Sequence, residues 1–401
     1  MISLDVTLDA LLTCSLAIAA LGLVMCVANL RRYRPPPASP GPADALVTVC
    51  VPARNEAANL EPCVRSLLSQ THRALEVLVY DDESTDETPQ ILERLGAGDA
   101  RVRRVATVPL PAGWNGKQFG CDRMGRAATG EWLLFTDADV RFEPTCVGRT
   151  LAEAVRPRNG PKCALISTFP RQIVGSPGEA LVVPLIHFIL LSYLPLGRMR
   201  KRLDPGTSAG CGQFLLVRRA VWMECGGHGA FRASMHDGIQ LPRVLRRNGH
   251  GTDLFDGTAL VSCRMYRGFA ATWRGFSKNA FEGLGGVTLL VVISLLHLIG
   301  HVLPWTVLGW WAVAAAGGAL HDAAWRGPSS VQLWLGAAAA AAAFTVRLLL
   351  CVRFRQSWLS ALLHPVGILL MTAIQWESLR LHVTGNRRWK DRMAATGHTT
   401  G

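Results

Sequence analysis

The sequence has 401 residues, of which 49% are hydrophobic and 18% charged, with a formal net charge of +13. It is longer than one ordinary domain and too apolar for a disordered chain. Apolar residues concentrate in 10–30, 181–196 and 287–379 and leave a polar block between about 45 and 180. This distribution excludes a purely soluble enzyme and predicts a soluble domain joined to membrane-embedded segments.

Several basic clusters lie beside the apolar stretches. They are Arg31 with Arg32 and Arg34, Arg198 to Arg202, and Arg387 to Lys390. Their position favours anionic lipid over nucleic acid as the partner, so no nucleic acid is expected. The eleven cysteines form no C-x-x-C pair and no zinc-binding spacing, which favours reduced thiols facing the cytosol.

Ala10 to Leu30 is an uncharged run long enough to span a membrane. Basic residues follow this run instead of preceding it, which favours a retained anchor over a cleaved signal peptide. By the positive-inside rule the anchor, residues 1–34, ends in the cytosol, and a Pro-rich linker occupies 35–44. The domain that follows, 45–282, is therefore expected to be cytosolic.

Leu181 to Gly197 is apolar but short and contains two prolines, so we expect an interfacial or re-entrant helix, with a buried core helix as the alternative. Residues 283–384 are expected to hold three or four membrane helices. The number depends on whether Pro304 kinks one long helix or divides a hairpin. A basic cytosolic tail at 385–401 completes a multi-pass protein of the cell's inner (plasma) membrane.

The polar block alternates between strand and helix patterns. Strands are expected at 45–51, 76–80, 101–105 and 132–136, and helices at 60–69, 86–95 and 118–128. This alternation predicts an α/β fold with a parallel sheet and with ligands at the carboxyl ends of its strands.

Acidic residues follow two of these strands. Asp137 and Asp139 can hold a divalent cation together with a diphosphate, although a chance pair or a helix cap is the alternative. The second cluster, Asp81 to Asp86, can accept hydrogen bonds from a base or ribose, and its place in the same sheet strengthens the metal interpretation.

Three segments resemble the successive signatures of family 2 inverting glycosyltransferases: Val49 to Glu56, Tyr80 to Asp86, and Phe135 to Asp139. Gly113 to Lys117 and Arg267 to Asn279 are similar to the branch that glycosylates carotenoids, hopanoids and related membrane lipids. The resemblance implies a GT-A fold, with a parallel-rich sheet and helices on both faces. It also implies a nucleotide-diphosphate sugar donor, Mg²⁺ or Mn²⁺ as cofactor, and inversion at the anomeric carbon.

The resemblance assigns roles to individual residues. Pro52, Ala53, Arg54 and Glu56 would line the nucleotide pocket, Asp81 or Asp82 would contact the base, Lys117 would help neutralise the phosphates, and Asp137 with Asp139 would bind the metal diphosphate. Asp237 falls at the general-base position, where His236 replaces the family's Glu. His236 could tune Asp237 or act as the base itself, and a helix cap is the alternative role for Asp237.

The Gln-x-x-Arg-Trp motif of processive synthases is absent after Asp237. Gln240 and Arg243 have the spacing, but they come too early and Val244 replaces the Trp. This favours addition of a single sugar over polymerisation. Gly210 to Phe214 is either an acceptor loop, where glycines permit close backbone approach, or a plain turn.

These observations predict a membrane-anchored, metal-dependent inverting glycosyltransferase. It would move one sugar from a nucleotide-diphosphate sugar, with a UDP-sugar as the first candidate, to a membrane lipid such as a carotenoid, hopanoid or other polyprenyl-type acceptor. The alternatives are a non-catalytic sugar-nucleotide-binding membrane protein and a polysaccharide-related glycosyltransferase.

Overall fold

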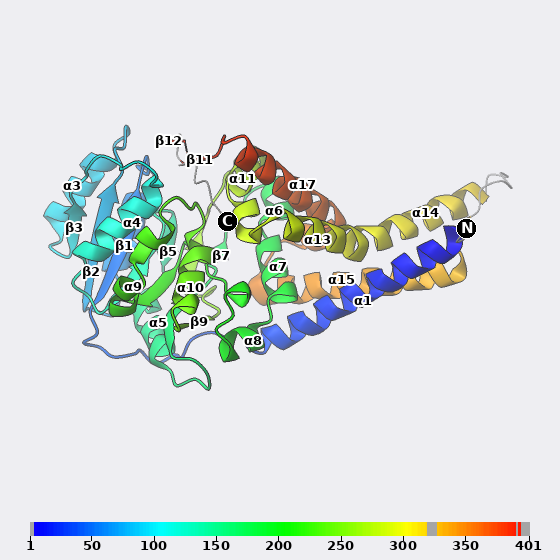
Figure 1. Cartoon of the computed structure of the whole chain (residues 1–401), viewed down its shortest axis with the longest axis horizontal. Coiled ribbons are helices and arrows are strands. Elements are labelled where there is room, and N and C mark those ends of the chain that lie inside the picture. Colours follow the sequence, from blue (N-terminus) through cyan, green and yellow to red (C-terminus); the bar gives the residue numbers. More distant parts are fainter. Residues whose placement is uncertain (1–3, 319–326, 390–391, 394–401) are drawn as a thin grey trace. The chain divides into compact units, whose positions relative to one another are not determined.

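The computed structural model describes residues 4–318, 327–389 and 392–393 (Figure 1). Internal contacts divide the chain into a helical unit, made of residues up to 31, 174–195 and 266–380, and a sheet-containing unit, made of 32–173, 196–265 and the described residues from 381 on. Residues 174–195 and 266–282 therefore group with the helices, whereas the sequence led us to expect them within 45–282.

A seven-stranded sheet forms the centre of the second unit. Its order is β3 (Val102–Val105), β2 (Leu75–Asp81), β1 (Val47–Ala53), β4 (Trp132–Phe135), β8 (Leu215–Arg218), β6 (Cys163–Ser167) and β9 (Gly251–Leu254). Only β8 runs against its neighbours, so the sheet is parallel except at this strand. The expected α/β architecture is confirmed.

Adjacent residues of each central strand face two separate hydrophobic cores, as expected for strands buried on both faces. On β1, Val49 belongs to the core that includes α2 (Leu60–Leu68), α3 (Thr88–Gly98) and α5 (Cys146–Val155). Cys50 belongs to the core that includes α4 (Gly116–Ala127), α9 (Arg219–Glu224) and α10 (Asp237–Arg247). Helices thus cover both faces of the sheet (Figure 1).

Smaller elements complete this unit. A three-stranded sheet contains β5 (Val140–Phe142), β10 (Val261–Cys263) and β7 (Arg171–Gln172), and β11 (Arg388–Trp389) pairs with β12 (Arg392–Met393). Between the larger elements lie α8 (Leu196–Lys201) and two 3₁₀ turns, η1 (Pro205–Thr207) and η2 (Gly227–Phe231).

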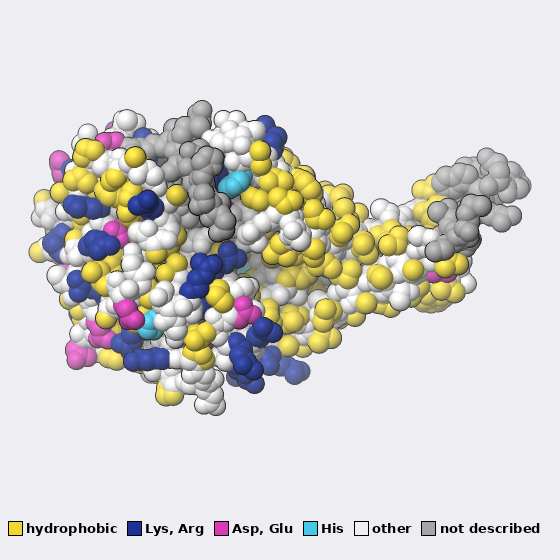
Figure 2. Space-filling model, viewed as in Figure 1, with side chains coloured by type: hydrophobic (Ala, Val, Ile, Leu, Met, Phe, Trp, Pro, Cys, Tyr) yellow, Lys and Arg dark blue, Asp and Glu magenta, His cyan; other side chains and the backbone are white. Residues whose placement is uncertain are grey.

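The helical unit contains three helices long and apolar enough to cross a membrane: 5–30, 287–316 and 330–354. Their elements are α1 (Leu4–Leu30), α13 (Val287–His297) with η3 (Leu298–Val302) and α14 (Leu303–Gly318), and α15 (Ser330–Phe354). Shorter members are α6 (Pro177–Val182), α7 (Leu185–Tyr193), α11 (Phe269–Ser277), α12 (Ala280–Leu284), α16 (Trp358–Leu362) and α17 (His364–Val383). Figure 2 shows hydrophobic side chains over this region, and Leu21, Val24 and Trp334 are each more than 60% exposed.

Pro304 does not divide a hairpin. The chain continues from α13 to α14 through the π-helical turn η3, and Pro304 is the second residue of α14. Proline is tolerated in the first turn of a helix, where its missing N–H is not needed. The third expected C-terminal segment, 358–379, is split between α16 and α17 and is not among the three candidate spans.

The apolar segment at 181–197 spans α6, α7 and the start of α8. Phe188 and Leu191 on α7 are fully buried, and Asn29 at the end of α1 donates hydrogen bonds to the carbonyl oxygens of Leu191 (2.9 Å) and Leu194 (2.7 Å). These contacts within the helical unit favour the alternative of a buried core helix.

Candidate active site

Three parallel strands end at one edge of the large sheet. In the register of β1 and β2, Ala53 lies opposite Asp81, and in that of β1 and β4, Cys50 lies opposite Phe135. Three segments therefore lie side by side at this edge of the sheet. They are the loop after β1, the acidic turn after β2 and the Asp137–Asp139 turn after β4. This is the edge at which ligands bind in open α/β sheets.

The loop after β1 and the turn after β2 are bonded to each other. The Arg54 guanidinium donates to the carbonyl oxygens of Asp82 and Glu83 (3.2 Å to the latter), and it lies 3.7 Å from the Asp82 carboxylate. Asn55 accepts from the amide of Thr85 at 2.8 Å. Both loops thereby have a defined conformation.

Two non-glycine residues in these loops adopt the left-handed conformation, Asn55 and Glu83, each with φ of 52°. Such conformations cost energy and persist where surrounding contacts hold them, often at binding sites. The amides of Glu56 and Ala57 donate to Thr88 (2.8 Å) and Asp86 (3.0 Å). The predicted residues Pro52, Ala53, Asp81 and Asp82 are all buried beneath this surface.

Lys117 joins two carboxylates that are distant in the sequence. Its ammonium nitrogen lies 2.7 Å from Oδ1 of Asp137 and 2.9 Å from Oδ2 of Asp237. Lys117 is in the first turn of α4, where the side chain of Asn115 accepts from the Lys117 amide at 3.0 Å and caps the helix. Asp237 is the first residue of α10. Two helix starts therefore bring these charges to the end of β4.

Burial and charge oppose each other in this trio. Burial acts to lower the pKa of Lys117, but the Asp137 and Asp237 carboxylates raise it well above its ordinary value. Burial likewise acts to raise the pKa of Asp237, and the Lys117 ammonium outweighs it and lowers that pKa. Lys117 is therefore charged and Asp237 ionised at neutral pH.

Asp139 has different surroundings. Burial, together with the nearby Asp137 carboxylate, raises the pKa of Asp139 to about 7. Its Oδ1 is buried and has no hydrogen-bond partner in the described chain. Buried polar atoms are normally satisfied, so this oxygen lacks a ligand of some kind.

The residues present fit a divalent cation shared with a diphosphate. Asp137 and Asp139 provide carboxylate oxygens, the ligands that Mg²⁺ and Mn²⁺ prefer, one of them the unsatisfied Oδ1 of Asp139. Within residues 4–318, 327–389 and 392–393 no cluster of three or more His, Cys, Asp or Glu side chains could hold a metal by itself.

Glycines allow the 210–214 loop to touch the start of α10. A Cβ atom on Gly212 would overlap the carboxylate of Asp237, and one on Gly210 would lie 2.9 Å from the carbonyl oxygen of Gly238. The other oxygen of Asp237, Oδ1, accepts from the Gly238 amide at 2.9 Å. His236 precedes it as the N-cap residue without a side-chain capping bond. Asp237, in the first turn of the helix, thus accepts from a helix amide and also faces Lys117.

Sequence reasoning missed a set of polar residues near Asp137 and Asp139. Thr136 donates to the carbonyl oxygen of Gln213 (2.8 Å), and the Gln213 amide donates to the Cys263 sulfur at 3.0 Å. The Cys263 thiol in turn hydrogen-bonds the Asp139 side chain. Gln213 lies in the glycine-containing loop already noted, but nothing in the sequence pairs it with Cys263.

Comparisons with known proteins agree with this fold. Residues 48–226 match the family model described as glycosyl transferase family 2. A mannosyltransferase from Pyrobaculum calidifontis, solved in complex with GDP-Man and Mn²⁺, superposes with a TM-score of 0.51 at 18% identity, over 92% of this chain and 99% of that one.

Two curated relatives are similar in sequence. A 4,4'-diaponeurosporenoate glycosyltransferase from Staphylococcus haemolyticus is 24% identical over 258 residues, which are 64% of this chain and 67% of the relative. A GalNAc(5)-diNAcBac-PP-undecaprenol beta-1,3-glucosyltransferase from Campylobacter jejuni is 33% identical over 94 residues, 23% of this chain and 29% of the relative. The chain thus spans two thirds of the first relative and less than a third of the second.

The sheet, with its acidic strand ends, has the GT-A fold. The match over residues 48–226 and the similar glycosyltransferases identify the chain as a glycosyltransferase. Its three candidate membrane helices associate it with a membrane.

Proposed function

We propose that this glycosyltransferase moves a single sugar, with inversion, from a nucleotide-diphosphate sugar to a membrane lipid, using Mg²⁺ or Mn²⁺. The observation that carries the proposal is the convergence of Asp137, Lys117 and Asp237 at the end of β4. A direct displacement needs a site that binds the diphosphate and a cation that stabilises the negative charge of the departing diphosphate. It also needs a carboxylate that accepts the proton of the acceptor hydroxyl.

The donor would lie across the strand ends. The Arg54–Glu56 loop and the Asp81–Asp82 turn would hold the nucleoside, and Asp137 with Asp139 would hold the cation, which stabilises the charge of the departing diphosphate. Lys117, now shared by two carboxylates, would reorient one of its N–H groups toward a phosphate oxygen. The relative solved with GDP-Man and Mn²⁺ supports a donor and a cation of this kind. A UDP-sugar is our first candidate.

Asp237 would act on the acceptor. As a buried, ionised carboxylate it can accept the proton of a lipid hydroxyl while the oxygen attacks the anomeric carbon from the face opposite the diphosphate. Attack from that side inverts the configuration. An acceptor carboxylate would need no such proton transfer, and Asp237 would then only orient it.

A lipid acceptor is supported by the apolar helices and by the first relative, whose name gives 4,4'-diaponeurosporenoate as the molecule it glycosylates. Carotenoids, hopanoids or other polyprenyl-type lipids would then enter the enzyme laterally from the membrane. We propose that the sheet-containing unit is cytosolic and that the helices lie in the cell's inner membrane.

The activity test uses the full chain in detergent with a lipid extract and labelled UDP- and GDP-sugars. We expect one sugar per lipid product by mass spectrometry, the opposite anomeric configuration by NMR, and no product in excess EDTA until Mg²⁺ or Mn²⁺ is restored. Retained configuration would overturn the single displacement, and full turnover in EDTA would overturn the metal.

The orientation test uses single cysteines introduced into a cysteine-free chain. Ala97 on α3 and Ser330 at the start of α15 are both exposed. In intact cells an impermeant thiol reagent should label Ser330→Cys and not Ala97→Cys, and inverted vesicles should reverse the pattern. Labelling of Ala97→Cys from outside would overturn the cytosolic assignment.

A further inference from the structure

A strongly basic pocket lies at α8, in the sheet-containing unit and apart from the strand-end site. Its volume is about 510 Å³. The cationic side chains that line it are Arg32, Arg198, Arg200, Lys201 and Arg202. No carboxylate lines it. Figure 2 shows Lys and Arg side chains gathered around α8.

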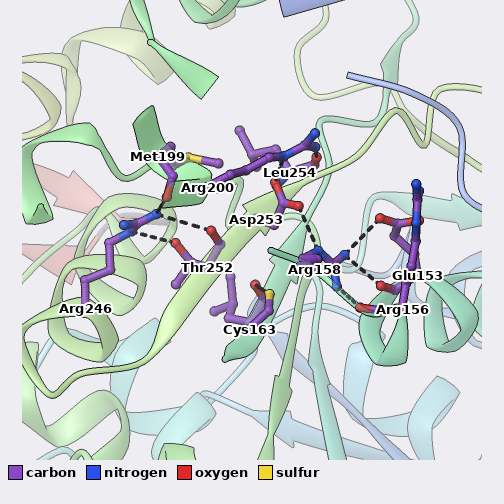
Figure 3. Close-up of polar contacts among 11 residues, drawn as sticks. Glu153, Arg156, Arg158, Cys163, Met199, Arg200, Arg246, Thr252, Asp253 and Leu254 are labelled. Atoms are coloured by element: carbon purple, nitrogen blue, oxygen red, sulfur yellow. Dashed lines mark hydrogen bonds and ion pairs between the residues drawn. The ribbon is translucent and has the colours of Figure 1, made fainter. Parts of the chain in front are cut away.

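Buried ion pairs hold one wall of this pocket. Arg200 donates to Asp253 at 2.8 Å, and Asp253 also accepts from Arg158 at 3.0 Å (Figure 3). Arg158 also donates a hydrogen bond to the Glu153 carboxylate at 2.8 Å. Glu153 and Asp253 are each at most 5% exposed, so these contacts are shielded from water and fix the Arg200 side chain.

A second buried arginine holds the backbone of α8. The Arg246 guanidinium donates to the carbonyl oxygens of Met199 and Arg202, each at 2.5 Å, and to the Thr252 hydroxyl at 2.9 Å. Met199, Arg246 and Thr252 meet in this way in Figure 3. Arg246 therefore anchors the C-terminal end of α8. The last carbonyl groups of a helix have no partner within the helix and can accept such bonds.

The charges of the pocket are not balanced. Arg198 is paired with Asp204 at 2.9 Å and Arg200 with Asp253, but Lys201 and Arg202 are exposed and have no carboxylate partner in the described part of the chain. Like charges held together by a rigid scaffold repel one another and attract an anion. Arginine forks and a lysine ammonium are the groups that bind phosphate oxygens.

The chain itself connects this pocket to a candidate membrane helix. Arg32 follows the end of that helix, Leu30, by two residues. The Arg32 side chain reaches α8, because a Cβ atom on Gly197 would lie 3.2 Å from its Nε atom. If α1 crosses the membrane, two residues place this side of the pocket within reach of lipid headgroups.

We infer that the α8 pocket binds the phosphate group of an anionic membrane lipid and fixes the enzyme at the membrane surface. The inference rests on the proposed membrane location but not on sugar transfer. It concerns a site separate from that of the donor, and its ligand is a phosphate-bearing headgroup rather than the reacting lipid.

The test uses native mass spectrometry of the full chain in detergent, titrated with phosphatidylglycerol, phosphatidylcholine or inorganic phosphate. The variant Lys201→Gln/Arg202→Gln removes the two unpaired charges, and Arg73→Gln/Arg94→Gln removes two exposed charges elsewhere in the same unit as the matched control. Each cation near an anionic lipid surface contributes roughly 1 kcal/mol, so the pocket variant should bind phosphatidylglycerol about 30-fold more weakly. Lys201→Arg/Arg202→Lys should retain binding.

Equal affinity of the pocket and control variants for phosphatidylglycerol would overturn the site. Equal affinity of the unmodified chain for phosphatidylcholine would overturn the anionic preference. If inorganic phosphate displaced the lipid and bound by itself in a Lys201- and Arg202-dependent way, the ligand would be a free anion and the lipid assignment would be wrong. Binding of the nucleotide sugar, measured in parallel, should be the same in all variants, so that failure here is distinct from failure of the proposed catalysis.

Discussion

The ammonium nitrogen of Lys117 lies 2.9 Å from Oδ2 of Asp237. The two residues lie in the first turns of different helices, α4 and α10, on the same face of the sheet. Because both side chains are largely shielded from water, each depends on the other for its charge. The same lysine contacts Asp137. The proposed base Asp237, the proposed phosphate-binding Lys117 and the proposed metal ligand Asp137 therefore form one electrostatic cluster.

Lys117→Met should destabilise the fold as well as impair catalysis. Removing one member of a buried ion pair leaves the other charge uncompensated, and we expect the free energy of unfolding to fall by about 3 kcal/mol. Denaturant unfolding measures this, with Lys117→Arg as the charge-retaining control. Unchanged stability of Lys117→Met would show that the pair contributes little.

Asp237→Asn should separate binding from turnover. The amide keeps the shape of the side chain but cannot accept a proton, so donor affinity should persist while kcat for a hydroxyl acceptor falls by about 10² to 10⁴. Asp44→Asn, at an exposed position far from the site in sequence, serves as the control. Loss of donor binding to the same extent would instead make Asp237 a structural cap. Normal turnover of Asp237→Asn would make His236 the candidate general base.

Asp139→Ala should abolish metal binding. Its unsatisfied buried oxygen is lost, and with it a ligand whose contribution to leaving-group stabilisation is of order several kcal/mol. Electron paramagnetic resonance of Mn²⁺ in the presence of UDP reports binding independently of activity. The Asp44→Ala variant should bind as the unmodified chain does. Undiminished Mn²⁺ binding by Asp139→Ala would remove Asp139 from the site.

Gly212→Ala should impair catalysis through a contact that only the structure reveals. The added methyl group overlaps the Asp237 carboxylate, so either the loop or the carboxylate must move. Displacement of a reacting group by about 1 Å can cost 10²-fold in rate. Gly98→Ala, where no atom lies within 4 Å of the new Cβ, is the matched control and should keep full activity. Equal kcat values would contradict the tight contact.

Glu76→Gln should destabilise the protein at neutral pH but not in acid. Burial acts to raise the pKa of Glu76, but hydrogen bonds from Thr48, Thr129 and Arg103 outweigh it and lower that pKa from 4.5 to about 2. A carboxylate with a lowered folded-state pKa stabilises the fold above pH 4.5, and this stabilisation disappears as the pH falls toward 2.

We expect Glu76→Gln to cost about 1 to 2 kcal/mol at pH 7 after allowing for solvent screening, and progressively less below pH 4. Denaturant unfolding at pH 7 and at a pH below 4 measures the difference in the free energy of unfolding between the variant and the unmodified chain. The control is Glu93→Gln, whose side chain is 72% exposed, and it should have no effect at either pH. A pH-independent cost for Glu76→Gln would mean that packing, not charge, is involved.

Much of the sheet-containing unit could be predicted from the chain alone. The apolar runs at 75–81 and 132–135 are buried strands. The acidic residues at their ends had to lie at one edge, because both strands run parallel to β1. Asp137 and Asp139 could be predicted because they follow a strand, whereas Lys117 could be assigned only through the resemblance to family 2 glycosyltransferases. Periodicity and motif spacing are local properties, and the sequence carries them directly.

Other features depended on the tertiary structure. Whether Pro304 bends or breaks its helix, and whether the segment at 181–197 is interfacial or buried, depends on neighbours distant in the chain, such as Asn29 beside α7. The Lys117–Asp237 contact, the Gln213–Cys263 bond beneath Asp139 and the basic pocket around α8 likewise join distant segments. Composition and motifs indicated a family 2 glycosyltransferase with apolar helices. Close packing decided which charges are paired. An ion pair forms only where the fold excludes water and brings two side chains within about 3 Å.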